Sequence, residues 1–317
     1  MRTFLSPLLL GALLFAAPLA TAPAKAAEPL TLLLDWFVNP DHAPLIVAQQ
    51  KGFFEDEGLE VTMIEPADPN APPKLVAAGQ AELAITYQPS LHIQASQGLP
   101  LTRIATLVAT PLNSLVVLED GPIKEIADLK GRKVGFSVGG FEDALLSAML
   151  AEAGLTLADV ELVNVNFSLS PALLSGQVSA VIGAFRNFEL NQLELENSKG
   201  RAFYVEEHGV PAYDELILIA NSGRLDDPRL RKALRALERG VQYLVNHPEE
   251  SWRIFAAHRK GLDDELNRRA WRDTLPRFAL RPAALDRGRY QRFAEFLKHR
   301  EMIDEVPPVE TYAIQLR

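Results

Sequence analysis

The sequence predicts an α/β protein of two lobes, each built on a mostly parallel β-sheet flanked by helices, with a ligand cleft between the lobes. Three observations support this. Short apolar runs alternate with helical patterns along most of the chain, as in sheets covered by helices on both faces. The alternation falls into two similar series, one on each side of residue 114. Extended segments near residues 112–118 and 211–219 join the two series, as in two-lobed proteins.

The first series opens with the segment around which the chain is organised. Leu32–Leu34 is an apolar run that predicts a strand, and residues 37–42 contain the Asn, Pro and Asp residues typical of a turn. Pro44 opens a helical pattern, and Gly52 ends it. A strand, a polar loop and a helix in this order place a ligand at the carboxyl end of a sheet, against a helix N-terminus.

The other elements follow from the same alternation of apolar runs and turn residues. Further strands are predicted at Leu59–Ile64, Glu82–Thr86, Leu101–Val108, Leu115–Leu118, Lys133–Phe136, Glu161–Asn166, Ala180–Phe185 and Glu215–Asn221. Helices are predicted at Lys74–Ala78, Leu91–Gln97, Ile126–Leu129, Phe141–Ala153, Ala172–Ser175, Pro228–Val245, Glu249–Ala257, Asp263–Leu275 and Arg287–Arg300. We therefore expect residues 27–113 and 218–317 to form lobe 1 and residues 114–217 to form lobe 2.

The first 26 residues differ from the rest and predict a cleaved export signal. Arg2 gives a positive start, Leu8–Ala17 is an apolar core, and Ala24–Ala26 is an A-x-A cleavage site. Two prolines interrupt this stretch, and no later segment offers the roughly 18 apolar residues of a membrane span. We therefore expect a periplasmic protein, cleaved near Ala26.

Charge and composition exclude several classes of function. Without the first 26 residues the chain holds 30 basic and 41 acidic residues, a net charge near −11, which argues against a nucleic-acid partner. The absence of cysteine excludes disulfides, thiolate metal sites, a cysteine nucleophile and a lipid-modified N-terminal cysteine. The histidines have no metal-ligand spacing, and no G-x-S-x-G motif occurs. We expect a monomeric binding protein with no catalytic residues, no metal and no cofactor.

Four loops follow predicted strands, two in each series, so we expect all four to face one cleft. They span residues 35–42, 87–90, 137–140 and 185–189. Their candidate ligand contacts are Asp35, Trp36, Asn39, His42, Tyr87, Gln88, Ser137, Gly139, Gly140, Phe185, Asn187, Phe188 and Glu189, and Tyr213 is a further candidate before the returning strand. Stacked rings gain about 0.5–1.5 kcal/mol per pair beyond area burial, and a carboxylate accepts from an amine. This composition fits a planar heteroaromatic molecule.

Each candidate also has a structural interpretation. Trp36 fits a core position, Asn39 fits a helix cap, and Tyr87 fits a cover for the sheet edge. Glu189 fits a solvated helix charge. The glycines at 139 and 140 lack the nucleotide-binding spacing, so we expect them to offer only backbone N–H groups at a helix N-terminus.

Several motifs resemble the NMT1/THI5-like substrate-binding proteins, over residues 30–310. They include L-D-W-F-V-N-P-D-H-A-P, A-Q-Q-K-G-F-F-E-D-E-G-L-E-V, D-L-K-G-R-K-V-G-F and G-A-F-R-N-F-E. The K-G-F-F and D-L-K-G-R-K-V-G segments are shared by many solute-binding proteins of ABC importers and imply a type II periplasmic-binding-protein fold. The D-W-x-x-N-x-x-H segment is similar to the subgroup that binds thiamin-pyrimidine precursors, such as formylaminopyrimidine or hydroxymethylpyrimidine.

The resemblance implies a role for particular residues and a partner. Glu189 would hold the aminopyrimidine, Trp36, Tyr87 and Phe185 or Phe188 would stack on the ring, and an ABC permease would receive it. Riboflavin, a sulfonate such as taurine, and nitrate remain open as ligands, because Arg186 favours an anion and Glu189 does not. The family also includes the pyrimidine synthase of thiamin biosynthesis, which uses a lysine-bound pyridoxal phosphate and a cysteine-rich motif. This chain has Thr86 and Tyr87 where that lysine would stand, and it has no cysteine.

Overall fold

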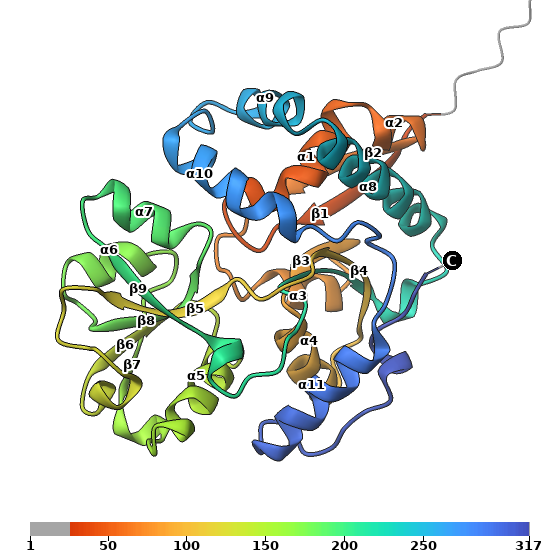
Figure 1. Ribbon diagram of the computed structural model, residues 1–317. Coiled ribbons are helices and arrows are strands. Elements are labelled where there is room, and N and C mark those ends of the chain that lie inside the picture. The colour runs from red at the N-terminus through yellow and green to blue at the C-terminus, as the bar shows by residue number, and fades with distance from the viewer. Residues whose placement is uncertain (1–25, 317) are drawn as a thin grey trace, which may run out of the picture.

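A computed structural model describes residues 26–316, so residues 1–25 of the predicted export signal lie outside the described part. The chain forms two five-stranded sheets, each flanked by helices, which stand side by side (Figure 1). We call the sheet that contains the first strand, with its helices, the first lobe, and the other sheet with its helices the second lobe. The predicted two-lobed α/β architecture is confirmed.

The first sheet has the strand order β2-β1-β3-β10-β4. Its strands are β1 (Glu28–Leu33), β2 (Leu59–Ile64), β3 (Leu83–Thr86), β4 (Leu101–Val108) and β10 (Leu216–Asn221). β1 pairs in parallel with β2 and β3, and β10 pairs antiparallel with β3 and β4. Four strands therefore run in one direction, and the strand that returns from the second lobe runs against them.

The second sheet repeats this arrangement with the order β7-β6-β8-β5-β9. Its strands are β5 (Asn113–Leu118), β6 (Lys133–Phe136), β7 (Glu161–Asn164), β8 (Ala180–Phe185) and β9 (Gly200–Tyr204). β6 pairs in parallel with β7 and β8, and β5 pairs antiparallel with β8 and β9. Here too the strand that arrives from the other lobe, β5, is the one that runs against the rest. Both sheets are mixed, and their shared order is the fold's internal repeat.

Helices cover both faces of each sheet. The α-helices are α1 (Ala43–Gln50), α2 (Phe53–Asp56), α3 (Pro72–Ala77), α4 (Gln88–Ser96), α5 (Phe141–Glu152), α6 (Leu169–Leu174), α7 (Glu189–Leu195), α8 (Pro228–Asn246), α9 (Pro248–His258), α10 (Glu265–Thr274) and α11 (Arg287–His299). The 3-10 helices are η1 (Pro40–His42), η2 (Ile126–Leu129), η3 (Leu157–Asp159), η4 (Val205–Glu207), η5 (Ser222–Arg224), η6 (Leu275–Arg277) and η7 (Val309–Thr311). None of the described helices is long and apolar enough to cross a bilayer.

Alternate residues of β10 show how one strand serves two layers. Leu216 and Leu218 belong to the core cluster that includes α1 and α8, whereas Ile217 and Ile219 belong to a second cluster with Tyr290 of α11. Because side chains of a strand point alternately to the two faces, a strand covered on both sides must be apolar at every position. The run LILIA meets that requirement.

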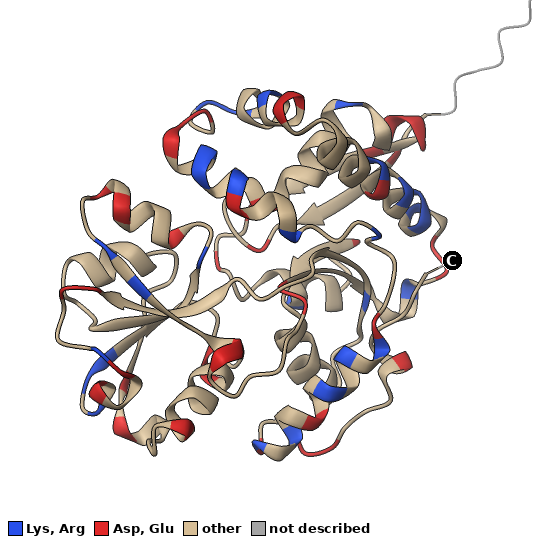
Figure 2. Ribbon diagram, viewed as in Figure 1, with Lys and Arg blue, Asp and Glu red and all other residues tan. Residues whose placement is uncertain are grey.

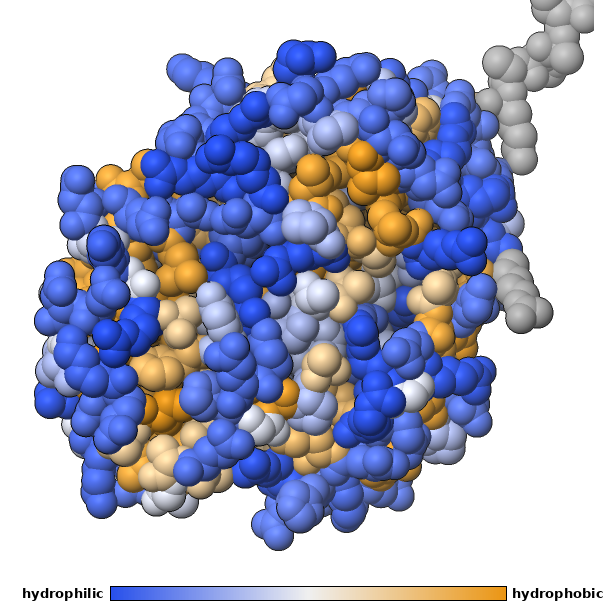
Figure 3. Space-filling view, viewed as in Figure 1, coloured by the Kyte–Doolittle hydropathy of each residue, from blue (hydrophilic) through white to orange (hydrophobic). Residues whose placement is uncertain are grey.

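α8 shows how local sequence places the longest helix. The Asp227 carboxylate caps it by accepting the Arg229 backbone N–H, and Pro228 occupies the first turn. Its basic residues are blue in Figure 2, and several pair with acidic groups of neighbouring elements, for example Arg235 with Glu57 and Arg239 with Asp56. These pairs neutralise the basic charges locally. The space-filling view shows a mainly hydrophilic surface with separate hydrophobic patches (Figure 3).

Some predicted boundaries were wrong, and some elements were missed. β1 begins at Glu28 rather than Leu32, and α4 begins at Gln88 inside the predicted loop. β9, α2 and α7 were not predicted. The segment GRAFY of β9 lacks an apolar run, and it becomes a strand because it pairs along the edge with β5. Tertiary pairing overrode local propensity there.

Candidate functional site

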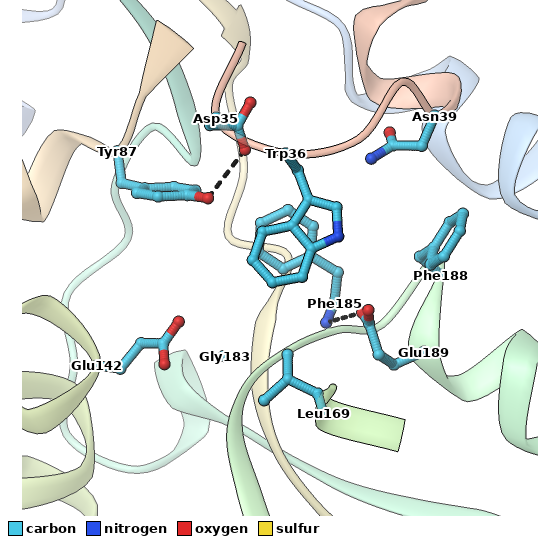
Figure 4. Close-up of a pocket in the computed structure, with 10 residues that line it drawn as sticks. All are labelled: Asp35, Trp36, Asn39, Tyr87, Glu142, Leu169, Gly183, Phe185, Phe188 and Glu189. Atoms are coloured by element: carbon cyan, nitrogen blue, oxygen red, sulfur yellow. Dashed lines mark hydrogen bonds between the residues drawn. The ribbon is translucent and has the colours of Figure 1, made fainter. Parts of the chain in front are cut away.

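The candidate site is a pocket at the carboxyl ends of β1, β3 and β8, where the two lobes face each other (Figure 4). Its lining residues are Asp35, Trp36, Asn39, Tyr87, Glu142, Leu169, Gly183, Phe185, Phe188 and Glu189. The space between them, with its mouth, measures about 380 Å³. The ends of strands bring these residues together because parallel strands of one sheet finish at the same edge.

Asp35 is held in place by two neighbours. The Tyr87 hydroxyl donates to Asp35 Oδ2 at 2.9 Å, and His42 Nε2 lies 2.9 Å from Asp35 Oδ1. The Asn39 backbone N–H donates to His42 Nδ1 at 3.3 Å, so in the neutral imidazole the proton is on Nε2 and is donated to Asp35. Burial, with the charge of Asp35, raises the pKa of Tyr87 well above its usual value, so this hydroxyl remains a donor.

Glu189 contributes an acidic group from the second lobe. It opens α7, and its Oε2 accepts the Phe185 backbone N–H at 2.7 Å. Glu189 is only 8% exposed, and burial raises the pKa of its carboxyl group to about 7. A helix N-terminus favours the ionised carboxylate, but loss of water outweighs that effect here.

Glu142 is a second acidic group from the same lobe. It lies in the first turn of α5, 3% exposed, and its Oε2 accepts the Ser137 backbone N–H at 2.7 Å. Burial raises its pKa well above the usual range. Gly183 of β8 makes room for this side chain, because a Cβ there would lie 2.5 Å from Glu142 Cδ.

Aromatic rings surround these groups. Trp36 contacts Phe167 of the second lobe edge-on, with ring centroids 4.5 Å apart. Tyr87 stacks on Phe141 with centroids 5.1 Å apart, and Phe185 meets Tyr87 edge-on at 6.4 Å. The lining therefore combines flat apolar walls with carboxylates at their margins.

The lining is acidic and has no basic residue. Three of its ten residues are Asp or Glu, and its side-chain donors are the Trp36 indole, the Asn39 amide and the Tyr87 hydroxyl already bound to Asp35. Arg186 does not line this pocket: it pairs with Glu206 at 2.6 Å and lies over the Tyr204 ring. The arrangement suits a neutral or cationic ring that donates hydrogen bonds, and it disfavours an anion.

The structure brings seven of the fourteen sequence-predicted residues into the pocket lining: Asp35, Trp36, Asn39, Tyr87, Phe185, Phe188 and Glu189. Three others are buried nearby and have protein partners. His42 supports Asp35 from behind. Gln88 Oε1 accepts the backbone N–H of Asp214 at 2.8 Å, and the Tyr213 hydroxyl donates to Glu215 at 3.0 Å. These three residues therefore support the residues around the pocket and do not line it.

The remaining four predicted residues lie at contacts between the lobes or in another cavity. Gly139 and Gly140 line a second cavity between α4 and their own loop, whose space, with its open mouth, measures about 950 Å³. The Gly139 N–H donates to Asn70 of the first lobe at 3.1 Å, and Ser137 donates its backbone N–H to Glu142. Asn187 Nδ2 donates to Asp41 of the first lobe at 2.7 Å. The backbone donors of the glycine-rich loop are thus used within the protein.

Sequence reasoning missed Glu142, Leu169 and Gly183 of the lining. Gly183 carried a signal, since a glycine inside an otherwise apolar strand marks the close approach of another group. Glu142 follows the glycine-rich loop directly, but it stands on the helix, where we expected only backbone donors. Leu169 carried no signal. Among residues 26–316 no group of three or more His, Asp or Glu residues could hold a metal ion.

The comparisons with known proteins agree with this geometry. Residues 39–251 match the model of the family described as "NMT1/THI5 like". The chain is 54% identical to a "Putative thiamine biosynthesis protein" of Haemophilus influenzae, over 93% of this chain and 95% of the relative. It is 34% identical to a "Formylaminopyrimidine-binding protein" of Halalkalibacterium halodurans, over 84% and 81%. At 28% identity it also matches a "4-amino-5-hydroxymethyl-2-methylpyrimidine phosphate synthase" of Legionella pneumophila, over 87% and 88%.

Solved structures confirm the fold. The alkanesulfonate-binding protein SsuA from Xanthomonas axonopodis superposes with a TM-score of 0.72 at 16% identity, over 92% of this chain and 99% of that one. At this identity the likeness shows the fold alone. The predicted two-lobed periplasmic-binding-protein fold is therefore confirmed.

Proposed function

The chain belongs to the NMT1/THI5-like family, and from this premise we propose that it is the solute-binding protein of an ABC importer for a thiamin-pyrimidine precursor. Formylaminopyrimidine and hydroxymethylpyrimidine are the candidate ligands. The observation that carries the proposal is the pocket itself, where aromatic walls from both lobes enclose carboxylates and no basic side chain contributes to the lining. A donor-rich aminopyrimidine complements that composition.

The proposed binding mode uses the walls and the margin of the pocket. The ring lies against Trp36 and the Phe185 side of the cleft, and Glu189 accepts hydrogen bonds from the exocyclic amine. A Kd near 1 μM requires about 8 kcal/mol, which one stacked ring and several buried hydrogen bonds can supply. Ligand that binds both lobes favours their closed arrangement, and the permease recognises that arrangement.

The alternative ligands of this fold are anions or a larger flavin. Sulfonates and nitrate need converging cationic or backbone donors, and Arg186, which favoured them in the sequence, pairs with Glu206 outside the pocket. The backbone N–H of Gly139 donates to Asn70. These observations favour the aminopyrimidine over the anions.

We infer a binding protein rather than a synthase. The synthase reaction implied by the family resemblance needs a lysine for pyridoxal phosphate and a set of cysteines. None of the ten lining residues is a lysine, Thr86 and Tyr87 stand at the resemblance's lysine position, and the sequence has no cysteine. The synthase relatives are also more distant than the binding-protein relative.

The location and the partner follow from the same inference. We propose that the chain is exported, that its signal is cleaved near Ala26, and that the monomer delivers ligand to permease subunits in the membrane. We further propose that residues 27–113 and 218–317 move as one lobe and residues 114–217 as the other. The strands that cross between the sheets, β5 and β10, support this division.

A panel of ligands tests the proposal. Thermal unfolding of the purified protein is measured with formylaminopyrimidine, hydroxymethylpyrimidine, riboflavin, taurine and nitrate, and hits are titrated by calorimetry. We expect the two pyrimidines to raise the melting temperature most, because a ligand stabilises the state that binds it. A larger rise with taurine or nitrate, and none with either pyrimidine, contradicts the proposal.

Two variants and a matched control tie the binding to this pocket. Trp36→Ala removes a wall and Glu189→Gln removes an acceptor charge, so we expect each to weaken pyrimidine binding at least tenfold. Glu196→Gln makes the same chemical change at an exposed position just after α7 and should leave affinity unchanged. Equal affinities in all four proteins would place the binding site elsewhere.

A further inference from the structure

Glu142 is a buried acid that the proposed binding mode does not yet use. Its carboxyl group is bound by backbone N–H groups of Ser137 and Val138. Within the described residues it forms no ion pair with a lysine, arginine or histidine. An acid that gives up water without a counter-cation is costly to the fold. Such a group is expected where a ligand supplies the missing partner.

The structure makes room for this group and aims it into the pocket. Gly183 faces it, and any larger residue there would collide with its carboxyl carbon. Leu169, another residue of the lining, offers no polar atom in its side chain. In Figure 4, Glu142 and Glu189 lie on opposite sides of the pocket with Leu169 between them. A ring in this space therefore meets one carboxyl group at each of two edges.

We propose that Glu142 accepts a hydrogen bond from a second substituent of the ring whose exocyclic amine is held by Glu189. The inference rests on the proposed function and narrows its ligand class. The ligand carries two donors: the ring amine, and an amine, an amide N–H or a hydroxyl group on a side arm of the ring. A primary ammonium group suits Glu142 best, because its positive charge favours the ionised carboxylate that burial alone disfavours.

The same geometry excludes phosphorylated forms of the ligand. A phosphate ester on this arm would place a dianion in a pocket that Asp35 lines and that no basic residue neutralises. Like charges in a desolvated site repel strongly. The protein therefore takes up the free alcohol or amine, and a kinase-type reaction that phosphorylates the pyrimidine must act after uptake.

The test compares four ligands that differ at one position. They are 4-amino-2-methylpyrimidines with a 5-aminomethyl, 5-formamidomethyl, 5-hydroxymethyl or 5-methyl group, and calorimetry gives their Kd for wild type and Glu142→Gln. Glutamine keeps an oxygen for the Ser137 N–H. We expect the variant to weaken 5-aminomethyl binding at least tenfold, the two neutral donors about threefold, and 5-methyl less than twofold.

Asp143→Asn is the matched control. Asp143 is the next residue of α5, and its Oδ2 accepts the Gly140 N–H at 3.1 Å, so the variant disturbs the same loop without reaching the lining. We expect it to change all four Kd values by one common factor. A common factor for Glu142→Gln, or no change, overturns the inference and leaves the proposed function standing. Failure of every pyrimidine to bind wild type overturns both.

Discussion

Single residues at the junction of the lobes show a common feature: acids buried without a basic partner. Asp41, Glu189 and Glu215 are buried, and burial raises their pKa values to about 6, 7 and 7. Burial also raises the pKa of Glu142 well above its usual range. Because each group prefers its proton in the folded state more than in the unfolded state, each makes stability depend on pH.

Glu215 gives the cleanest test of this dependence, because it lies outside the pocket. It accepts the backbone N–H groups of Leu112 and Asn113 at 2.6 and 2.9 Å, yet burial still raises its pKa from 4.5 to about 7. The unfolded chain loses this proton near pH 4.5 and the folded chain near pH 7. The stability that the protonated form provides is therefore complete below pH 4.5 and is lost as pH rises to 7.

We expect the free energy of unfolding of wild type, relative to Glu215→Gln, to fall by up to about 3 kcal/mol between pH 4.5 and 7. Above pH 7 the difference should stay constant. Urea unfolding at pH 5, 6, 7 and 8 measures it. Glutamine cannot ionise, so every other titrating group cancels in the comparison. A difference that does not vary with pH would show that Glu215 ionises normally.

The sequence predicted pocket residues where strand ends determine them. Tyr87 directly follows β3, and Trp36 and Glu189 lie in the loops just after β1 and β8, so locating the strands located these side chains. Ser137 follows β6 in the same way, but its hydroxyl donates to the Asn166 carbonyl and its N–H to Glu142. Which member of a loop faces the ligand depends on such hydrogen bonds, and local sequence patterns do not show which partners form them.

At the scale of elements, α1 and α8 show that close packing can decide whether a substitution stabilises or destabilises the protein. Gly240 lies inside α8, where alanine would normally stabilise a helix by about 1 kcal/mol. A Cβ at Gly240 would lie 2.9 Å from the Cβ of Ala48 and closer still to the Pro44 carbonyl oxygen of α1. The backbone of α1 cannot move aside cheaply, because its residues from Ala43 to Ala48 are buried.

We therefore expect Gly240→Ala to destabilise the protein by about 1–3 kcal/mol, since overpacking outweighs helix propensity. Gly288→Ala is the matched control in α11, where the Cβ would meet only side-chain ends, Arg292 Nη1 at 3.1 Å and Asp286 Oδ1 at 3.4 Å. That variant should be neutral or slightly stabilising. Urea unfolding of both variants against wild type measures the effects, and a stabilising Gly240→Ala would contradict the packing argument.

Elements with strong patterns were predictable, and elements that depend on neighbours were not. α8 carries apolar residues at helical spacing and a capped N-terminus, so its place followed from the sequence. α7, with the sequence ELNQLEL, buries only Glu189 and Leu193, and it is stabilised by contacts with α10 and α6. Such contacts between distant segments leave no local trace.

At the scale of the whole molecule, the two lobes meet around the pocket. Trp36 packs against Phe167, and Asn70 bonds both to Gly139 and to the Ser137 carbonyl. The sequence predicted two lobes and a cleft because the strand-and-helix series occurs twice. It could not predict these contacts between the lobes, because each depends on how far the cleft has closed.

One contact between the lobes is buried directly behind the pocket. Asn187 of the second lobe donates from Nδ2 to Asp41 Oδ1 and to Thr274 Oγ1, both at 2.7 Å, and both acceptors belong to the first lobe. Opening the cleft would break these bonds and hydrate Asp41. The three residues therefore form a latch that favours the closed arrangement, although none of them lines the pocket.

Removing the latch should weaken the binding of every ligand by the same factor, because the latch does not contact the ligand. In Asn187→Ala the closed form leaves Asp41 buried with fewer donors, at a cost of about 1–2 kcal/mol, so a smaller fraction of molecules is closed. We expect pyrimidine affinity to fall about tenfold, mainly through faster dissociation, and by the same factor for every ligand bound. Stopped-flow measurement of tryptophan fluorescence gives the dissociation rate.

Asn191→Ala is the control, one turn along α7. It removes two bonds from Nδ2, to Asp273 of α10 at 2.8 Å and to the Asn187 backbone carbonyl at 2.9 Å, and keeps the Asn187 side chain. It should change affinity less than twofold, because exposed polar contacts contribute little. Equal effects of the two variants would show that closure does not depend on the buried latch.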